Sequence, residues 1–410
     1  MLNYALGDAA MQVATVSDMG GRVAADKFGS GLRAGRRNDS LRRLARYSLL
    51  GTAIALLTSQ QATAQASNGV RFIPSVIVSS TVPANGDGNP YGVAFVPPGF
   101  PGGGLLKPGD LLVSNFNNSV PIEGTGTTII KLTLNGQVEP SGSASVFFQG
   151  TTPPPLGLTT ALGVLKSGFV LVGSVPTTEG TFATIQPGSL LILDRNANVV
   201  ATLTAANLLD SPWDLTIQDG GNVAKVFVSN VVSGTVTRLE LAIINGSPVV
   251  LSTTQIAKNY TVVPNGPAVI LGPTGLAYDA QEDVLYVAST ADNEIFAVPN
   301  AGSRPAPPAN GTGTVIFSGK QLRGPLALVL APNGDLITSN GDAVNADVNH
   351  PSEIVEFTKD GKFVGQFNLD PAQGGAFGIA VESLGDNQAR FAAVDDNTND
   401  ISVYLLETED

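Results

Sequence analysis

The chain of 410 residues contains no cysteine and only one histidine, His350. Without cysteine it can form neither disulfides nor thiolate metal sites, so its stability depends on the packing of its core. One histidine also excludes a zinc or copper site built from several imidazoles. Charged residues make up only 14% of the chain, and all three methionines lie within the first 19 residues. The remainder contains no sulfur and therefore resists sulfur oxidation.

Long amphipathic helical patterns are missing after residue 65. Glycine (47) and proline (27) are abundant, and β-branched residues dominate the apolar set. This composition is typical of many short strands joined by tight turns. We therefore expect residues 66–410 to form a single all-β domain.

Residues 1–65 have the layout of a leader with a secretory signal peptide. Five arginines between Arg36 and Arg46 precede the apolar run Ser48–Thr58, and the small residues 62–64 follow it. This order predicts cleavage near Ala64. A membrane anchor is the alternative, but the run is about half of the roughly twenty residues that span a bilayer. We expect a bacterial protein exported to the periplasm or beyond, by the general or the twin-arginine route, while residues 1–30 show no pattern and are consistent with a mis-assigned start.

Residues 66–410 are strongly acidic. They carry 14 Lys and Arg against 30 Asp and Glu, a net charge near −16. Such a surface repels phosphate backbones and anionic lipid headgroups. We therefore expect neither nucleic acid nor membrane as a partner, which leaves a small molecule, a glycan or another protein.

The chain after the leader repeats one pattern six times. Each repeat has a turn with a proline or small residue, an apolar strand, a second turn, and a strand that usually ends in Ser, Asn or Asp. The first strands lie in Asn89–Phe95, Leu158–Val164, Ser211–Ile217, Gly272–Tyr278, Gly324–Leu330 and Ala376–Val381. A period of roughly 50 to 60 residues is typical of one four-stranded sheet per repeat. The pattern predicts a six-bladed β-propeller with four-stranded blades.

The strand endings carry the resemblance to a known superfamily. They lie in Asp110–Asn115, Phe169–Ser174, Lys225–Asn230, Val284–Ser289, Asp335–Asn340 and Arg390–Asp395. The pattern resembles the NHL-type and TolB-like six-bladed propellers, a superfamily that also contains gluconolactonase-like hydrolases. This resemblance covers residues 66–410 and implies the fold.

The sixth repeat ends the chain after three strands. The segment Val70–Ser79 is expected to supply its outer strand and close the ring. Pro74 suits an outer edge, because proline cannot donate to a sheet ladder. We expect this segment to bury its apolar side chains, Phe72, Ile73, Val76, Ile77 and Val78.

The loops that follow the second strands are rich in Asn and Asp. In a propeller these loops share a face with the entrances of the blades. Carboxylate and amide oxygens are ligands of calcium and magnesium, and we predict the metal ligands Asn115, Asn230, Asn340 and Asp395. The alternative is that Asn and Asp occupy these turns because they tolerate left-handed backbone. The segment Asp395–Asn399 matches a calcium loop only in part, since Asp400 and Leu406 replace its glycine and glutamate.

The longest of these loops, residues 341–352, is the preferred place for ligand contact. The predicted contacts are Asp342, Asn345, Asp347 and Asn349, together with Trp213 and Asp214 at the entrance of the third blade. Trp213 has an alternative role in packing between blades. His350 lies in the same loop and is the candidate acid or base, with an inert surface turn as the alternative.

The resemblance also implies a metal-binding glutamate at a first-strand entrance, which this chain lacks. The entrances carry Asn89, Ser211, Gly272, Arg323 and Gly375. Gly-x-Ser-x-Gly and phosphate-binding glycine loops are absent as well. The leading hypothesis is a non-catalytic binding or interaction module that uses the Asx-rich loop face. The alternatives are a divalent-metal-dependent lactonase or lyase, with His350 as acid or base, and a calcium-stabilised structural propeller.

Overall fold

The computed structural model describes residues 70–72, 77–134, 138–151, 156–341, 349–385 and 388–408. The expected leader and its cleavage site lie outside these residues, and so do Ile73, Val76, Asp342, Asn345 and Asp347. Within the described ranges, no helix is long and apolar enough to cross a membrane.

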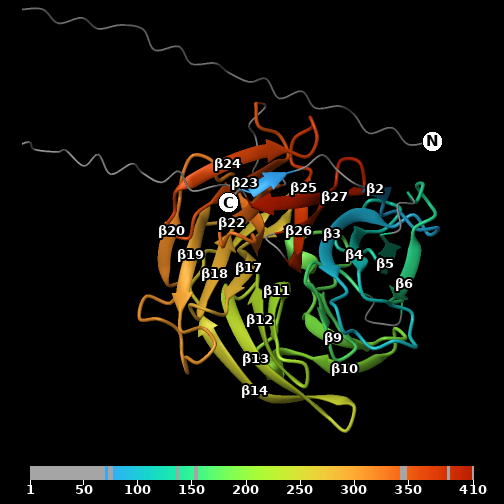
Figure 1. The fold of residues 1–410 in the computed structure, drawn as a ribbon, viewed down its shortest axis with the longest axis horizontal. Helices are drawn as coiled ribbons and strands as arrows, with labels where there is room; N and C mark the ends of the chain where they lie inside the picture. The colour runs from blue at the N-terminus through green and yellow to red at the C-terminus, as the bar shows by residue number, and fades with distance from the viewer. Residues whose placement is uncertain are drawn as a thin grey trace, which may run out of the picture. The chain divides into compact units, whose positions relative to one another are not determined.

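The described strands form six antiparallel blades around one axis, as predicted (Figure 1). Blade 1 contains β3 (Gly88–Phe95), β4 (Asp110–Asn117), β5 (Thr128–Thr133) and β6 (Ser145–Gln149). Blade 2 contains β7 (Leu162–Leu165), β8 (Phe169–Ser174), β9 (Ser189–Asp194) and β10 (Val199–Leu203). Blade 3 contains β11 (Pro212–Asp219), β12 (Val223–Asn230), β13 (Thr235–Ile244) and β14 (Ser247–Ala257).

The second half of the ring continues in the same order. Blade 4 contains β17 (Pro273–Asp279), β18 (Val284–Ser289), β19 (Glu294–Pro299) and β20 (Thr314–Phe317). Blade 5 contains β21 (Pro325–Leu330), β22 (Leu336–Asn340), β23 (Glu353–Phe357) and β24 (Phe363–Asn368). Blade 6 contains β25 (Ala376–Gly385), β26 (Gln388–Asp395) and β27 (Asp400–Thr408), joined by β1 (Val70–Phe72) and β2 (Ile77–Ser80). A hairpin of β15 (Val263–Asn265) and β16 (Val269–Leu271) and two short 3₁₀ helices, η1 (Phe182–Thr184) and η2 (Ala205–Asn207), lie in the connections.

The N-terminal segment closes the ring, which confirms the prediction. Both β1 and β2 pair antiparallel with β27, with Ile77 opposite Val403 and Ser80 opposite Asp400. At the axis, β3 contacts β7 on one side and β25 on the other, so the first and last blades are neighbours. The expected burial of Val78 is wrong, because this outer-strand side chain is 43% exposed.

Each interface between neighbouring blades has its own apolar cluster. Phe227, Phe357 and Phe391 are fully buried between blades 3 and 4, 4 and 5, and 5 and 6, respectively. Burial of one such side chain contributes about 2 kcal/mol. The core is therefore divided around the ring, which explains why apolar residues recur at the same place in every repeat.

The inner strands meet at a ring of small residues. This position holds Gly92, Ala161, Asp214, Gly275, Ala327 and Gly378. A Cβ atom at Gly378 would collide with the carbonyl oxygen of Tyr91 in the next blade. Asp214 is the only member with a longer side chain, and it lies at a register shift between β11 and β12.

Serines on the second strands of blades 1, 3 and 5 bind the inner strand of the following blade. Ser229 Oγ donates to the carbonyl oxygen of Thr274 at 2.7 Å and accepts from the Asp214 N–H at 3.0 Å. Ser339 Oγ donates to the carbonyl oxygen of Phe377 at 2.6 Å, and Ser114 is placed in the same way in blade 1. The serine in the repeated Ser-Asn ending therefore holds two blades together.

Replacing Ser229 by alanine is expected to lower the free energy of unfolding by about 1 to 3 kcal/mol, because buried backbone groups lose their partner. Chemical denaturation of residues 66–410 measures this loss. The matched control, Ser143→Ala, removes an exposed serine hydroxyl that bonds only within its own turn. Equal stability of both variants would contradict the role assigned to Ser229.

Candidate functional site on the propeller axis

Four aromatic side chains form a roof across the axis. This roof consists of Tyr91, Phe116, Trp213 and Phe377, and each of the four side chains is at most 6% exposed. Trp213 Nε1 donates a hydrogen bond to the Tyr91 hydroxyl at 2.9 Å, and the ring centroids of Tyr91 and Phe377 are 5.2 Å apart. All four side chains line a hollow on the loop face, whereas none lines the larger cavity at the other end of the axis. The roof thus separates two sites.

The upper pocket lies above the roof, on the face of the Asx-rich loops. It consists of two adjoining hollows of about 120 and 360 Å³ that share Asn89, Glu123 and Asp396. Asn117 and Asn118 line its wall, and the Asn117 Nδ2 group donates to Glu123 Oε1 at 2.9 Å. Among the described residues that line the pocket, the charged ones are all acidic. The pocket therefore combines an aromatic floor with a wall of amides and carboxylates.

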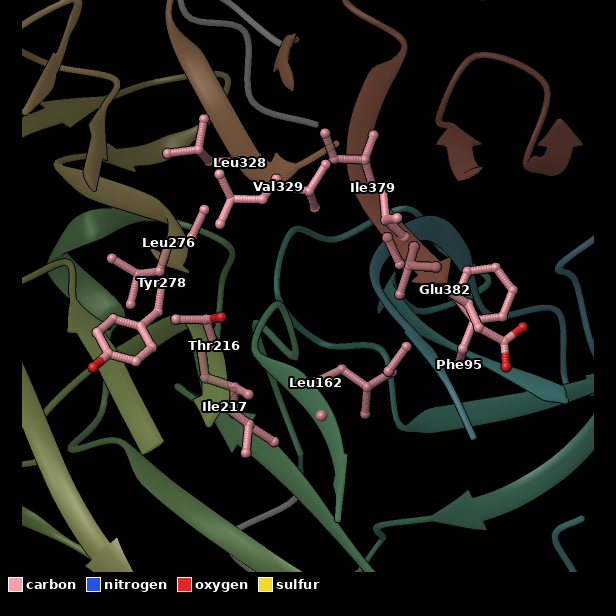
Figure 2. A pocket seen from close by; sticks show the side chains of 18 of the residues that line it. Phe95, Leu162, Thr216, Ile217, Leu276, Tyr278, Leu328, Val329, Ile379 and Glu382 are labelled. Atoms are coloured by element: carbon pink, nitrogen blue, oxygen red, sulfur yellow. The ribbon is translucent and has the colours of Figure 1, made fainter. Parts of the chain in front are cut away.

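The lower chamber lies on the other side of the roof and has a volume of about 560 Å³. All six inner strands line it (Figure 2). One aliphatic residue from each blade forms a collar, which comprises Val93, Leu162, Leu215, Leu276, Leu328 and Ile379. The collar therefore gives the chamber a band of apolar surface, which the amides and carboxylates in the wall of the upper pocket do not provide.

Asp214 is the one acidic side chain in the ring of small residues. Its Oδ2 atom accepts from the Leu276 N–H of blade 4 at 2.9 Å, and its Oδ1 atom accepts from the Leu215 N–H at 2.8 Å. Asp214 lines the lower chamber and is half-buried. This burial outweighs both hydrogen bonds and raises the pKa of Asp214 to about 7.

Three of the predicted metal ligands, Asn115, Asn230 and Asn340, form hydrogen bonds with the backbone of the segment that enters their own blade. Asn115 is fully buried and donates to the carbonyl oxygen of Thr81 at 3.0 Å. Asn230 accepts from the N–H of Asp210 at 3.2 Å, and Asn340 bonds to its own entrance loop in the same way. The structure places the three amides in three different blades, so the prediction that they share a metal stays a prediction.

The fourth predicted ligand, Asp395, ends β26 and accepts from the Asn397 N–H at 2.9 Å. Burial, and repulsion by Asp370, raise the pKa of Asp395 to about 6. Asn293 and Asn399 have φ angles of 55° and 56°, as expected for Asn in left-handed turns. Within the described part of the chain, no group of three or more His, Asp or Glu side chains is arranged to hold a metal ion.

The other predicted site residues have varied positions. Trp213 packs in the apolar cluster at the axis and also lines the upper pocket, so ligand contact by Trp213 stays a prediction. Asp214 lies below the roof and faces the opposite cavity. Asn349 and His350 lie in the turn before Pro351, Asn349 exposed and His350 half-buried, and neither lines the two axial sites.

Among the upper-pocket residues that the sequence interpretation missed are Tyr91, Phe116, Glu123 and Phe377. A signal was present for two of them. Tyr91, Trp213 and Phe377 occupy the same position in three repeats, directly before the member of the ring of small residues. Aromatic side chains at this position of the inner strands must meet at the axis.

No known protein family matches this sequence, and no curated protein matches it either. Several solved structures resemble the fold. A protein described as an oxidoreductase (glucose dehydrogenase) from Thermus thermophilus has a TM-score of 0.46 and 11% identity, over 82% of this chain and 100% of its own. The calcium-binding protein regucalcin from Agrobacterium tumefaciens has a TM-score of 0.44 and 12% identity, over 82% and 93%. A streptogramin B lyase has a TM-score of 0.40 and 12% identity, over 84% and 90%.

Proposed function

We propose that this protein is a non-catalytic binding module that acts in the periplasm or outside the cell. Its ligand is a small polyhydroxylated molecule, such as a sugar ring, and the binding site is the upper pocket. The observation that carries this proposal is the combination of the aromatic floor with a wall of amides and carboxylates. The use of the Asx-rich loop face agrees with the interpretation of the sequence.

The chemistry of the wall suits hydroxyl groups. A hydroxyl group donates to a carboxylate such as Glu123 or Asp396 and accepts from an amide NH₂ group such as that of Asn118. The floor offers apolar aromatic surface to the C–H face of a ring. A few placed polar groups over an apolar floor are typical of small-molecule sites. Phosphorylated ligands are disfavoured, because the described lining has no cationic side chain.

Calorimetric titration of residues 66–410 with a panel of neutral monosaccharides and disaccharides tests this function. We expect at least one sugar to bind, and we expect Glu123→Gln and Asp396→Asn to weaken it about 10-fold or more, since a hydrogen bond to a charged group contributes about 1.5 kcal/mol or more. The matched control, Glu240→Gln, changes an acid on β13 away from both axial sites and should leave binding unchanged. The proposal fails if no sugar binds, or if all three variants bind equally well.

The metal-dependent lactonase or lyase remains a second candidate, with one observation in its favour. Asn115 Oδ1 is buried and has no hydrogen-bond partner, and such an oxygen can coordinate a hard cation. If this candidate is correct, chelation lowers the melting temperature of residues 66–410, calcium or magnesium restores it, and lactones are turned over. An unchanged melting curve after chelation would remove this candidate and leave sugar binding unaffected.

A further inference from the structure

The lower chamber has features that the proposed sugar site does not explain. All six inner strands and their aliphatic collar line it, and the acidic side chains among its described lining residues are Asp214 and Glu382. The described lining contains neither lysine nor arginine. Glu382 has a counterion, since its Oε2 atom lies 3.4 Å from Arg390 Nε, whereas Asp214 accepts only backbone N–H groups.

We propose that the lower chamber is a second binding site, which takes a small aliphatic amine whose ammonium group pairs with Asp214. The five other blades have glycine or alanine where blade 3 has Asp214. The acidic side chain is therefore a specific feature of one blade and is not required to build the ring.

The geometry matches an amphiphilic cation in two respects. Directly below Asp214, the collar supplies apolar surface from every blade, and Figure 2 shows Leu162, Leu276, Leu328 and Ile379 around the opening. A volume of about 560 Å³ lies within the usual range for small-molecule pockets. Burial strengthens the attraction between an ammonium group and a carboxylate, because the local dielectric constant is low. An anionic or phosphorylated ligand would instead meet the two acidic groups, with no lysine or arginine among the described lining residues to offset their charge.

Calorimetric titration of residues 66–410 with n-hexylamine at pH 8 tests this proposal. We expect hexylamine to bind at least 10-fold more tightly than 1-hexanol, which has the same chain without the charge, and hexanoate not to bind. In Asp214→Asn the preference for the amine over the alcohol should disappear, while hexanol binding stays within about 2-fold. The matched control, Glu382→Gln, removes the other acidic group and should preserve the preference.

The pH dependence of the wild-type protein provides a second measurement, in case Asp214→Asn folds poorly. The pKa of Asp214 is raised to about 7, so below this pH its carboxyl group holds a proton that must leave before it pairs with an ammonium group. Hexylamine should therefore bind about 10- to 100-fold more weakly at pH 5 than at pH 8. The other titratable groups among the described residues that line the chamber are Glu382 and Tyr278. Burial raises the pKa of Tyr278 to about 12. Glu382→Gln should keep the same pH dependence.

Three outcomes would overturn the proposal. These are the absence of hexylamine binding at millimolar concentration, an unchanged preference for the amine in Asp214→Asn, and equal affinity at pH 5 and pH 8. Glu123→Gln, which tests the upper pocket, should bind hexylamine like the wild type. The two proposals therefore succeed or fail independently.

Discussion

A chain that begins at Asn85 should lose its cooperative unfolding transition, or melt at least about 10 °C below residues 66–410. Such a chain lacks β1 and β2, the outer strands of blade 6, and their loss exposes the edge of β27. Ile401 and Val403 of that strand are buried in the intact ring. An exposed apolar edge also favours aggregation.

The segment that follows β2 strengthens the expectation. The Thr81 N–H and hydroxyl both donate to the carbonyl oxygen of Asn399, at 2.9 and 2.8 Å, and Val82 O accepts from Gly142 N–H at 2.9 Å. These contacts join blade 6 to blade 1. At about 1 kcal/mol for each hydrogen bond, their loss together with the β2 ladder removes several kcal/mol, which is a large part of a typical total of about 5 to 15 kcal/mol.

Differential scanning calorimetry measures the effect, and a chain beginning at Ile77 is the control. That chain keeps β2 and loses only β1, so it should melt within a few degrees of residues 66–410. If the chain beginning at Asn85 melts like the longer ones, the N-terminal segment does not close the ring in solution.

The second large effect is expected for Trp213→Ala, which should lower the free energy of unfolding by about 3 to 5 kcal/mol. Trp213 is 3% exposed, its indole N–H bonds to Tyr91, and its ring contacts Phe116 edge-on with centroids 6.1 Å apart. Truncation leaves a cavity at the point where the blades meet, and the rigid inner strands cannot collapse into it. Trp213→Phe keeps most of the volume and should cost only about 1 to 2 kcal/mol, mainly through the lost hydrogen bond.

Denaturant titration compares these variants with Phe182→Ala. Phe182 lies in η1 and is 39% exposed, so its removal should change the free energy of unfolding by less than about 1 kcal/mol. If Trp213→Ala is no less stable than Phe182→Ala, the roof is not a structural element of the ring.

Most of the fold could be predicted from the sequence, because each repeat carries its own strand and turn signals. The apolar runs recur in all six repeats, prolines stand at four of the six entrances, and polar residues end most of the second strands. The missing fourth strand of the last repeat could be predicted as well, since a ring with an unpaired edge is unfavourable and Val70–Ser79 was the remaining strand-like segment. Val78 shows the limit of this reasoning, because burial on an outer strand depends on the neighbouring blade.

The candidate site was less accessible from sequence. Asn and Asp gather at the loop face, as predicted, yet the structure uses Asn115, Asn230 and Asn340 to hold blade entrances. A polar residue at the end of a strand can face a ligand or its own backbone, and sequence alone does not distinguish these orientations. Glu123 gave no signal at all, because it lies in an irregular connection that follows no repeat.

The sequence by itself determined the strand order, the number of blades, the closure of the ring and the acidic character of the surface. These properties depend on local periodicity and composition, and each repeat carries that information in its own sequence. Only the tertiary structure decided that Tyr91 and Trp213, which are 122 residues apart, form one roof, and that Asp214 and Trp213 face opposite cavities. Such contacts depend on how six blades meet at one axis, and that geometry is set by the packing of the complete ring.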